Sequence, residues 1–387
     1  MLYPKKMQNI LGLLGLLTVS AHLPDDYMMI QWFIGLSVCA IMLGVFVAKA
    51  VNWLPATLFT YILINGIFVF ASRWNYFSLH AHEFIYPASL RSLSVTTTVL
   101  VLVISSATIS GNVGKAIFNS IPAFTLINSM SVIASFLLGK KLFGNSGYVG
   151  FLDNASTNGC LIAACFGFLV VNRMWFFSAI SLLAIIVSNS SMPYGVLAAV
   201  LVGIAIKKRS RLALLSLAPV FLVGQVFEKE NFFNSSGRFQ AYKLFMAEWW
   251  DKGLIWFGTG LGSFNFLGPT IQCKHGYLVT ITNGMCSGSL FTWLHSDWLE
   301  LLFTTGIVGF LLGALVFLSA SYRLLKYDGA GDIELFSLWL GLNAFAMFNF
   351  PAQSFVVSFM FIFVLVSAYR LTPVPGKTDQ NPQVENH

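Results

Sequence analysis

Asn234-Ser235-Ser236-Gly237-Arg238 and His295-Ser296-Asp297-Trp298-Leu299-Glu300 bracket the stretch that decides how this chain folds. Between about 228 and 296 the sequence carries clustered charged and polar residues, whereas long apolar runs lie on either side. A run of about 20 apolar residues is long enough to cross a bilayer as a helix. The pattern therefore predicts a membrane-embedded chain with one large hydrophilic insert outside the membrane.

The composition supports the same class of protein. Hydrophobic residues make up 57% of the 387 residues, and charged residues only 10%. A soluble domain carries roughly 25% charged residues. The sequence thus predicts an all-α, polytopic integral membrane protein with about 12 transmembrane helices.

The expected spans recur along the whole chain. They lie near 7–23, 28–48, 51–72, 92–110, 117–138, 157–172, 174–189, 193–206, 212–227, 297–322, 333–350 and 352–370. No linker divides the chain, so we expect a single membrane domain over 1–387, interrupted by the large periplasmic loop 228–296. The tail 372–387 has low hydropathy and is expected to be disordered.

The positions of lysine and arginine predict the orientation. With twelve spans and a cytoplasmic N-terminus, 13 of the 22 basic residues fall on the cytoplasmic side. The densest cluster, Lys207-Lys208-Arg209-Ser210-Arg211, lies between two spans on that side. Because cytoplasmic loops are enriched in these residues, we expect both termini inside and the insert outside. The net charge of +7 is then a topology signal rather than a nucleic-acid footprint.

The insert is expected to begin with a helix. Asparagine and serine side chains at 234–236 can accept from the first free amides of a helix. Downstream aromatic residues recur at helical spacing and end in Trp249 and Trp250, which we expect to anchor an amphipathic helix at the membrane interface. Arg238 falls in the first turn, where it forms either an anion site with the free amides or a solvated side chain.

Two further features of the insert are a turn and a pair of cysteines. Three alternating glycines in Phe257-Gly258-Thr259-Gly260-Leu261-Gly262 predict a tight turn, and no lysine follows as in a phosphate-binding loop. Cys273 and Cys286 are the two cysteines of the external insert, so we expect them to form a disulfide. No cysteine or histidine spacing suited to zinc is present, and we expect no metal or cofactor.

The end of the insert carries the most reactive group of side chains. Asp297 and Glu300 are three residues apart and therefore share one helix face at the outer mouth of a span. His295 beside a carboxylate can accept a proton near neutral pH. The alternative is an interfacial histidine followed by acidic residues that the helix dipole favours.

These segments together resemble the O-antigen ligase/polymerase superfamily of bacterial envelope glycosyltransferases. The resemblance covers roughly 145–320, and each segment has its place in the family's order. The matching segments are Gly150-Phe151-Leu152-Asp153-Asn154-Ala155-Ser156-Thr157-Asn158, Ser188-Asn189-Ser190-Ser191-Met192-Pro193-Tyr194-Gly195-Val196-Leu197-Ala198, Ser236-Gly237-Arg238 with Trp249-Trp250, Gly258-Thr259-Gly260-Leu261-Gly262-Ser263-Phe264, and His295-Ser296-Asp297-Trp298-Leu299-Glu300 before Gly306-Ile307-Val308-Gly309.

The resemblance implies a substrate and roles for the residues. The donor would be a glycan on undecaprenyl pyrophosphate at the bacterial inner membrane, and the acceptor a sugar hydroxyl of a lipid-linked glycan or of lipid A-core. Arg238 would bind the pyrophosphate in a bidentate manner. His295 would act on the acceptor hydroxyl, with Asp297 or Glu300 orienting the imidazole. Polymerase, ligase and protein O-oligosaccharyltransferase stay open.

The chain departs from the family in one respect. The family has an arginine in the turn that matches 188–198, whereas this chain has none between Arg173 and Lys207. If a second cation binds the substrate, it would have to come from the same side of the membrane. The candidates are Arg73, Arg91, Lys140 and Lys141.

Two other classes of protein are alternatives. A secondary transporter or a flippase of envelope precursors also commonly has twelve spans, and would show ionisable groups at mid-membrane or broken helices. A serine hydrolase would need Ser287 or Ser289 beside His295, but no nucleophile turn surrounds either serine.

Overall fold

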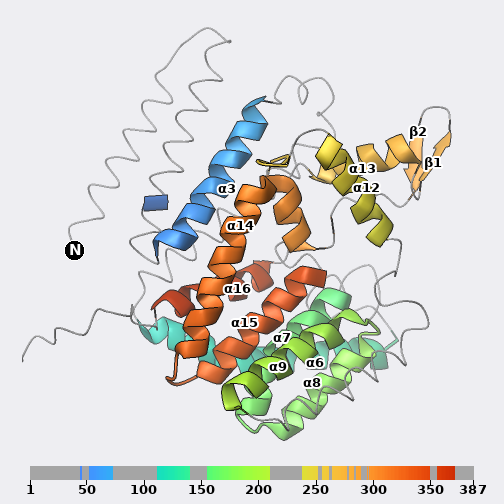
Figure 1. Cartoon of the computed structure of the whole chain (residues 1–387). Helices are drawn as coiled ribbons and strands as arrows, with labels where there is room; N and C mark the ends of the chain where they lie inside the picture. The colour runs from blue at the N-terminus through green and yellow to red at the C-terminus, as the bar shows by residue number, and fades with distance from the viewer. Residues whose placement is uncertain are drawn as a thin grey trace, which may run out of the picture.

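The structure is a computed structural model of the chain. It describes residues 44–45, 52–72, 111–139, 155–209, 238–251, 255–260, 264–276, 279–282, 285–288, 294, 296–348 and 355–370. Over these residues the chain is mainly helical, with one short β-hairpin in the insert (Figure 1). The predicted all-α class is confirmed there except for that hairpin.

Eight of the expected spans correspond to helices. These are α3 (Trp53–Ser72), α6 (Gly111–Leu137), α7 (Ala155–Val171), α8 (Trp175–Val187), α9 (Met192–Lys208), α14 (Asp297–Lys326), α15 (Asp332–Phe348) and α16 (Phe355–Arg370). The predictions near 7–23, 92–110 and 212–227, the tail 372–387 and almost all of 28–48 lie outside the described residues. By length and composition, two described helical stretches can cross a membrane, Ile117–Leu137 and Asp297–Lys326.

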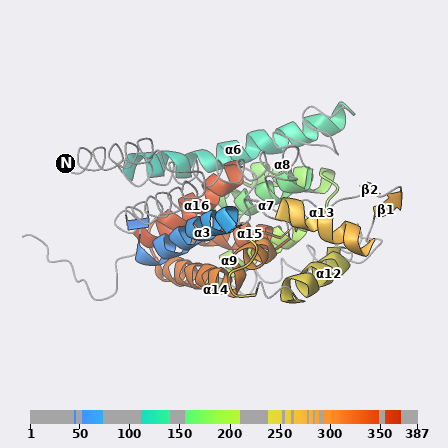
Figure 2. The same cartoon turned by 90° about the horizontal axis from the view of Figure 1, so that it is seen from above.

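Helix α7 forms the centre of a helical bundle. Its residues from Thr157 to Leu169 are all buried, and α6, α8, α9 and α15 surround it (Figures 1 and 2). Seen from above, α6 runs along one side of the molecule and α14 along the opposite side (Figure 2). Glycines allow close approach between helices: Gly167 and Gly203 both lie against Ser337 of α15. Small residues at helix contacts are typical of packing in membranes.

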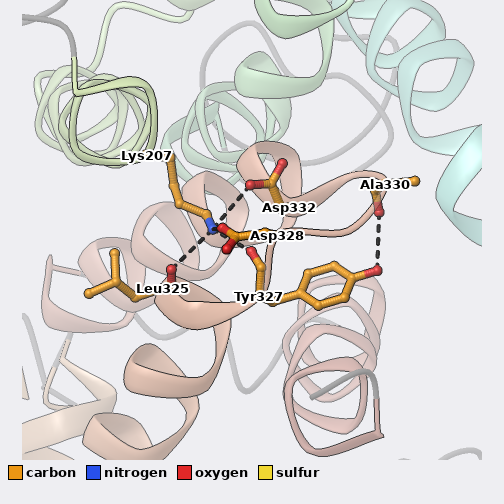
Figure 3. Close-up of polar contacts among 6 residues, drawn as sticks. All are labelled: Lys207, Leu325, Tyr327, Asp328, Ala330 and Asp332. Carbon is orange, nitrogen blue, oxygen red and sulfur yellow. Dashed lines mark hydrogen bonds and ion pairs between the residues drawn. The ribbon is translucent and has the colours of Figure 1, made fainter. Parts of the chain in front are cut away.

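Lys207 joins the ends of three helices (Figure 3). Its ammonium group lies 3.1 Å from Asp332 Oδ2 at the start of α15 and 3.8 Å from Asp328 Oδ1. It also donates to the Leu325 and Tyr327 carbonyls at the end of α14, at 3.1 Å and 2.5 Å. Only 4% of the side chain is exposed. Lys207 is therefore a buried connection between α9, α14 and α15, although its sequence cluster was interpreted only as a topology signal.

The predicted order of spans puts the end of α7 and the starts of α6 and α15 on the same side of the membrane, and these helix ends lie together. Asn172, just after α7, donates to Glu334 Oε1 in the first turn of α15 at 3.3 Å. Phe118, near the start of α6, packs against Gly331 just before α15. These contacts bring the end of α7 and the start of α6 to the start of α15.

Helix α14 is broken at Gly306 and folds back on itself. Gly306 has φ 71° and ψ −174°, which no helical residue adopts. The Trp298 ring lies 5.9 Å from that of Phe310 and 5.8 Å from that of Phe317. A straight helix would separate Trp298 and Phe317 by about 28 Å at 1.5 Å per residue. Residues 297–305, here called the half-helix, therefore lie alongside the second half of α14, 307–326 (Figure 1).

This break corrects the expectation of one straight span over 297–322. The straight part of α14 is 307–326, about 30 Å long at 1.5 Å per residue, which matches a bilayer core of about 30 Å. Leu301 of the half-helix packs against Gly313 of the second half. The sequence had suggested that Asp297 and Glu300 lie at the outer end of the span. Because the half-helix folds back, they lie beside the second half of α14 instead.

The second half of α14 exposes one apolar face. Leu311, Leu315, Leu318 and Tyr322 follow each other at three- and four-residue spacing, and each is more than half exposed. A continuous stripe of exposed apolar side chains marks a surface that contacts another protein, a ligand or a membrane.

The insert contains α12 (Arg238–Asp251), α13 (Phe264–His275), β1 (Val279–Thr282) and β2 (Met285–Gly288). The strands pair antiparallel, with Ile281 opposite Cys286. An aromatic core joins the insert to the half-helix, because the Phe264 ring lies 4.9 Å from that of Phe245 on α12 and 5.3 Å from that of Phe303. The helix predicted after Gly237 is confirmed, whereas the hairpin was not predicted.

One predicted feature of α12 is wrong. Trp249 is 3% exposed and packs in the same core as Phe245, so it is not an interfacial anchor. Trp250 is 65% exposed and keeps the exposure that an anchor needs. The helical face that is buried also carries Ala241 and Glu248, and it is this face that docks on α13.

Candidate functional site

The segment 255–260 closes the break in α14. Its backbone amides at Thr259 and Gly260 donate to the carbonyls of Phe303 and Thr304, at 3.0 Å and 2.7 Å. In return the Ile307 amide donates to the Ile255 carbonyl at 2.8 Å. Backbone groups that a broken helix leaves free must find partners, since an apolar surrounding supplies none. The predicted glycine turn therefore provides hydrogen-bond partners to a helix some forty residues later in the sequence.

Two polar side chains of α3 reach the same place. The Tyr61 hydroxyl donates to the Thr305 carbonyl at 2.7 Å, and the Asn65 amide donates to the Phe257 carbonyl at 2.6 Å. Asn65 is buried, and its Oδ1 has no hydrogen-bond partner. The sequence interpretation missed both residues, although an asparagine inside an apolar span is a recognisable signal of function.

The acidic pair lies at the start of the half-helix. Ser296 caps it by accepting from the Leu299 amide at 3.3 Å. Asp297 and Glu300 are both in the first turn, as predicted. Glu300 Oε2 is buried and has no hydrogen-bond partner, although the residue as a whole is partly exposed. The backbone of Leu294, the residue before His295, interacts with the Glu300 carboxyl group.

The side chains of the basic candidate residues lie outside the described residues. Arg238 is the first residue of α12, which confirms its place at a helix start, but its side chain lies outside the described residues. His295 lies outside them as well. The same holds for the four substitutes for the missing arginine, Arg73, Arg91, Lys140 and Lys141.

The two upstream segments of the family resemblance meet each other. A Cβ at Gly159, near the start of α7, would lie 2.6 Å from Pro193 Cγ and 2.8 Å from Ser188 Oγ. The Ser156 hydroxyl is 3.3 Å from Met192 Sδ in the same contact.

The described cysteines fall into two groups. Cys160 and Cys165 are buried free thiols of α7. Cys273 in the last turn of α13 is disulfide-bonded. The side chain of Cys286 lies outside the described residues, so the pairing Cys273–Cys286 stays a prediction.

A charged cluster that the sequence analysis did not identify connects the insert helices. Glu248 of α12 is buried and forms an ion pair with Lys274, in the last turn of α13. The same oxygen, Oε1, lies 2.9 Å from Nε2 of His275. Lys274 and His275 are partly exposed, so the cluster docks α13 on α12 at the surface of the insert. Within the described part of the chain, no group of histidine, cysteine and acidic residues has a metal-binding arrangement.

Neither a family model, nor a curated protein, nor a solved structure matches this chain. The class that the described residues define is a predominantly helical protein with apolar helices, in which a polar insert closes a broken helix.

Proposed function

We propose that this protein is an integral membrane glycosyltransferase of the bacterial inner membrane. It transfers a glycan from undecaprenyl pyrophosphate to a sugar hydroxyl at the periplasmic face, as an O-antigen or surface polysaccharide polymerase or ligase. The observation that carries the proposal is the convergence of three segments of the family resemblance. Helix α12 from Arg238, the segment 255–260 and the half-helix with Asp297 and Glu300 form one body.

The membrane location is supported by packing and by exposed surface. The stripe from Leu311 to Tyr322 exposes apolar side chains along a helix long enough to span a bilayer. The glycine contacts of α7, α9 and α15 support tight packing of helices in lipid. Twelve spans, with both termini in the cytoplasm and the 228–296 loop in the periplasm, complete the proposed topology.

The proposed chemistry is direct displacement at the anomeric carbon. The acceptor oxygen bonds to that carbon while the bond from the carbon to the pyrophosphate oxygen breaks, and the lipid pyrophosphate leaves with its electron pair. Arg238 stabilises the charge that develops on the leaving group, because a guanidinium binds two phosphate oxygens at once. His295 accepts the proton of the attacking hydroxyl. A pyrophosphate is already an activated leaving group, so this step uses no metal or cofactor of the protein.

The acidic residues orient the base in this proposal. The Leu294 backbone interacts with Glu300, and Ser296 caps the half-helix, so the peptide that carries His295 is attached to the start of that helix on both sides. A carboxylate near an imidazole fixes its tautomer and stabilises the imidazolium that forms. Glu300 fits this role through its unpartnered buried oxygen.

A transporter or flippase of envelope precursors is the second candidate, and the break in α14 favours it. Discontinuous helices that carry polar groups are typical of transporter substrate sites. Glu300 on the half-helix adds an ionisable group beside the second half of α14. Both candidates handle a lipid-linked glycan, but only the transferase forms a new glycosidic bond.

Deleting the gene and separating the surface polysaccharide on a gel tests the proposal. Loss of long chains indicates a polymerase, and undecorated lipid A-core indicates a ligase. A ladder of normal length and amount contradicts the transferase. Accumulation of the lipid-linked precursor in the inner leaflet identifies the flippase instead.

Reporter fusions test the topology on their own. A fusion at Asn265 in the insert should report the periplasm, and one in the tail after Thr372 should report the cytoplasm. The same compartment for both fusions would contradict the twelve-span arrangement.

A further inference from the structure

We propose that Tyr61 and Asn65 of α3 are positioning residues of the transferase site. They fix the angle of the half-helix at the Gly306 break and so determine where Asp297 and Glu300 lie. The inference rests on the proposed function. It adds a helix distant in sequence from every segment of the family resemblance.

The two side chains act from one face of α3. They are four residues apart, and residues at this spacing are neighbours on a helix surface. Tyr61 donates to the carbonyl of Thr305, which is the last residue of the half-helix. Asn65 donates to the Phe257 carbonyl, in the segment that pairs with the half-helix. One helix therefore holds both partners of the break.

The last three carbonyl groups of the half-helix accept hydrogen bonds from two different parts of the chain. The Phe303 and Thr304 carbonyls accept from the backbone of segment 255–260. The Thr305 carbonyl accepts from the Tyr61 hydroxyl instead. Backbone pairing alone fixes how close the half-helix lies to the segment, and the third bond fixes it to α3.

The burial of Asn65 supports a directing role over a packing role. The side chain is 6% exposed, and its Oδ1 has no hydrogen-bond partner. An apolar residue of similar size would fill this position without the cost of burying a polar group. The asparagine contributes the Nδ2 bond to the Phe257 carbonyl and also a side-chain interaction with Tyr61, so the two residues act together.

Small rotations at Gly306 have large effects at the acidic pair. Asp297 is nine residues from Gly306, or about 13 Å along the half-helix at 1.5 Å per residue. A rotation of about 5° at the break moves Asp297 by about 1 Å over that length. A displacement of about 1 Å in a catalytic site costs on the order of 10²-fold in rate. The donors that set this angle are thus expected to influence turnover without touching substrate.

Tyr61→Phe tests the inference, because it removes only the hydroxyl. Tyr322→Phe is the matched control: it makes the same change on the exposed face of α14. With the full chain in proteoliposomes, a polyprenyl-pyrophosphate glycan and a sugar acceptor, Tyr61→Phe should lower kcat by about 10- to 100-fold. The KM for the donor and the melting temperature should stay at the wild-type values. Turnover within twofold of wild type overturns the inference, as does a loss explained by a parallel fall in melting temperature.

Asn65→Leu should give a similar loss, and the double variant should lose less than the product of the two single effects. Non-additive effects are expected when two residues act on one element. Fully multiplicative losses would mean that the two side chains do not act through the same half-helix, which contradicts the inference.

A cross-link separates this inference from the proposed reaction. Leu301→Cys with Gly313→Cys should form a disulfide, since Leu301 packs directly on Gly313. Adding Tyr61→Phe should slow its formation, whereas adding Tyr322→Phe should not. If wild-type protein transfers no glycan but Tyr61→Phe slows the cross-link, the proposed function fails and the positioning role stands. An unchanged cross-linking rate contradicts the positioning role whatever the activity.

Discussion

Gly258 and Gly306 lie on the two backbone segments that face each other at the break in α14. Both have positive φ, 72° and 71°. A Cβ on Gly258 would overlap the Thr304 carbonyl and the Gly306 amide, and a Cβ on Gly306 would overlap the Trp256 carbonyl. Neither overlap is with a flexible side chain, so only glycine fits either position.

Gly306→Ala and Gly258→Ala should therefore each destabilise the fold. The unfavourable backbone conformation alone costs about 1–3 kcal/mol, and the overlap with backbone adds to it. Gly276→Ala is the control, because Gly276 has φ 61° but no atom within 4 Å of a Cβ. Thermal unfolding in detergent should show a larger loss for the two buried glycines than for Gly276. Equal losses at all three positions would contradict the close contact.

Lys207→Met should destabilise the bundle. The substitution leaves two carbonyls and the partly buried Asp332 without their cation. Removing one member of a buried ion pair costs about 3–5 kcal/mol. Lys208→Met changes the exposed neighbour in the same way and should be nearly neutral. A melting temperature that falls equally for both variants would mean that Lys207 does not connect the helices.

The disulfide of Cys273 should link it to Cys286. Non-reducing mass spectrometry should recover the joined peptides, and Cys160 and Cys165 should be alkylated once the protein is unfolded. Closing a loop of this size contributes about 3 kcal/mol, so a reductant should lower the melting temperature. Linkage of Cys273 to any other cysteine would contradict the predicted pair.

Glu248→Gln should loosen α13 from α12. The substitution removes the negative charge that Lys274 and His275 share. Protease added to spheroplasts should then cut the insert faster than in wild type, because the docked helices open more often. Asp251→Asn, an exposed carboxylate on the same helix, is the control and should leave the cutting rate unchanged. Equal protection of Glu248→Gln and wild type would show that the cluster does not dock the helices.

The sequence predicted those elements that depend on local pattern. Apolar length identified α7, α9 and α15, and the cap residues before Arg238 located the start of α12. The break in α14 was missed because hydropathy does not distinguish Gly306 from Gly309 or Gly313 in the same apolar run. What breaks the helix at Gly306 is its partner, the segment 255–260, and that pairing is a long-range contact.

The site was predicted in part for the same reason. Asp297 and Glu300 fall in the first turn of a helix, as their spacing indicated. The fold-back that brings Trp298 beside Phe317 changes where they lie, and no local pattern encodes it. Tyr61 joins the site through long-range contacts, a hydrogen bond to Thr305, 244 positions away, and packing against Gly309.

The most direct test of the account is glycan transfer by the purified full chain. Wild-type protein in proteoliposomes should join a glycan from undecaprenyl pyrophosphate to a sugar acceptor and release the lipid pyrophosphate, as detected by mass spectrometry. His295→Ala should slow turnover by about 10²–10⁴-fold. Arg238→Lys should stay impaired, because lysine keeps the charge but lacks the planar fork. Correctly inserted wild-type protein that binds the donor but forms no glycosidic bond, or alanine variants at both positions that transfer at the wild-type rate, would contradict the account.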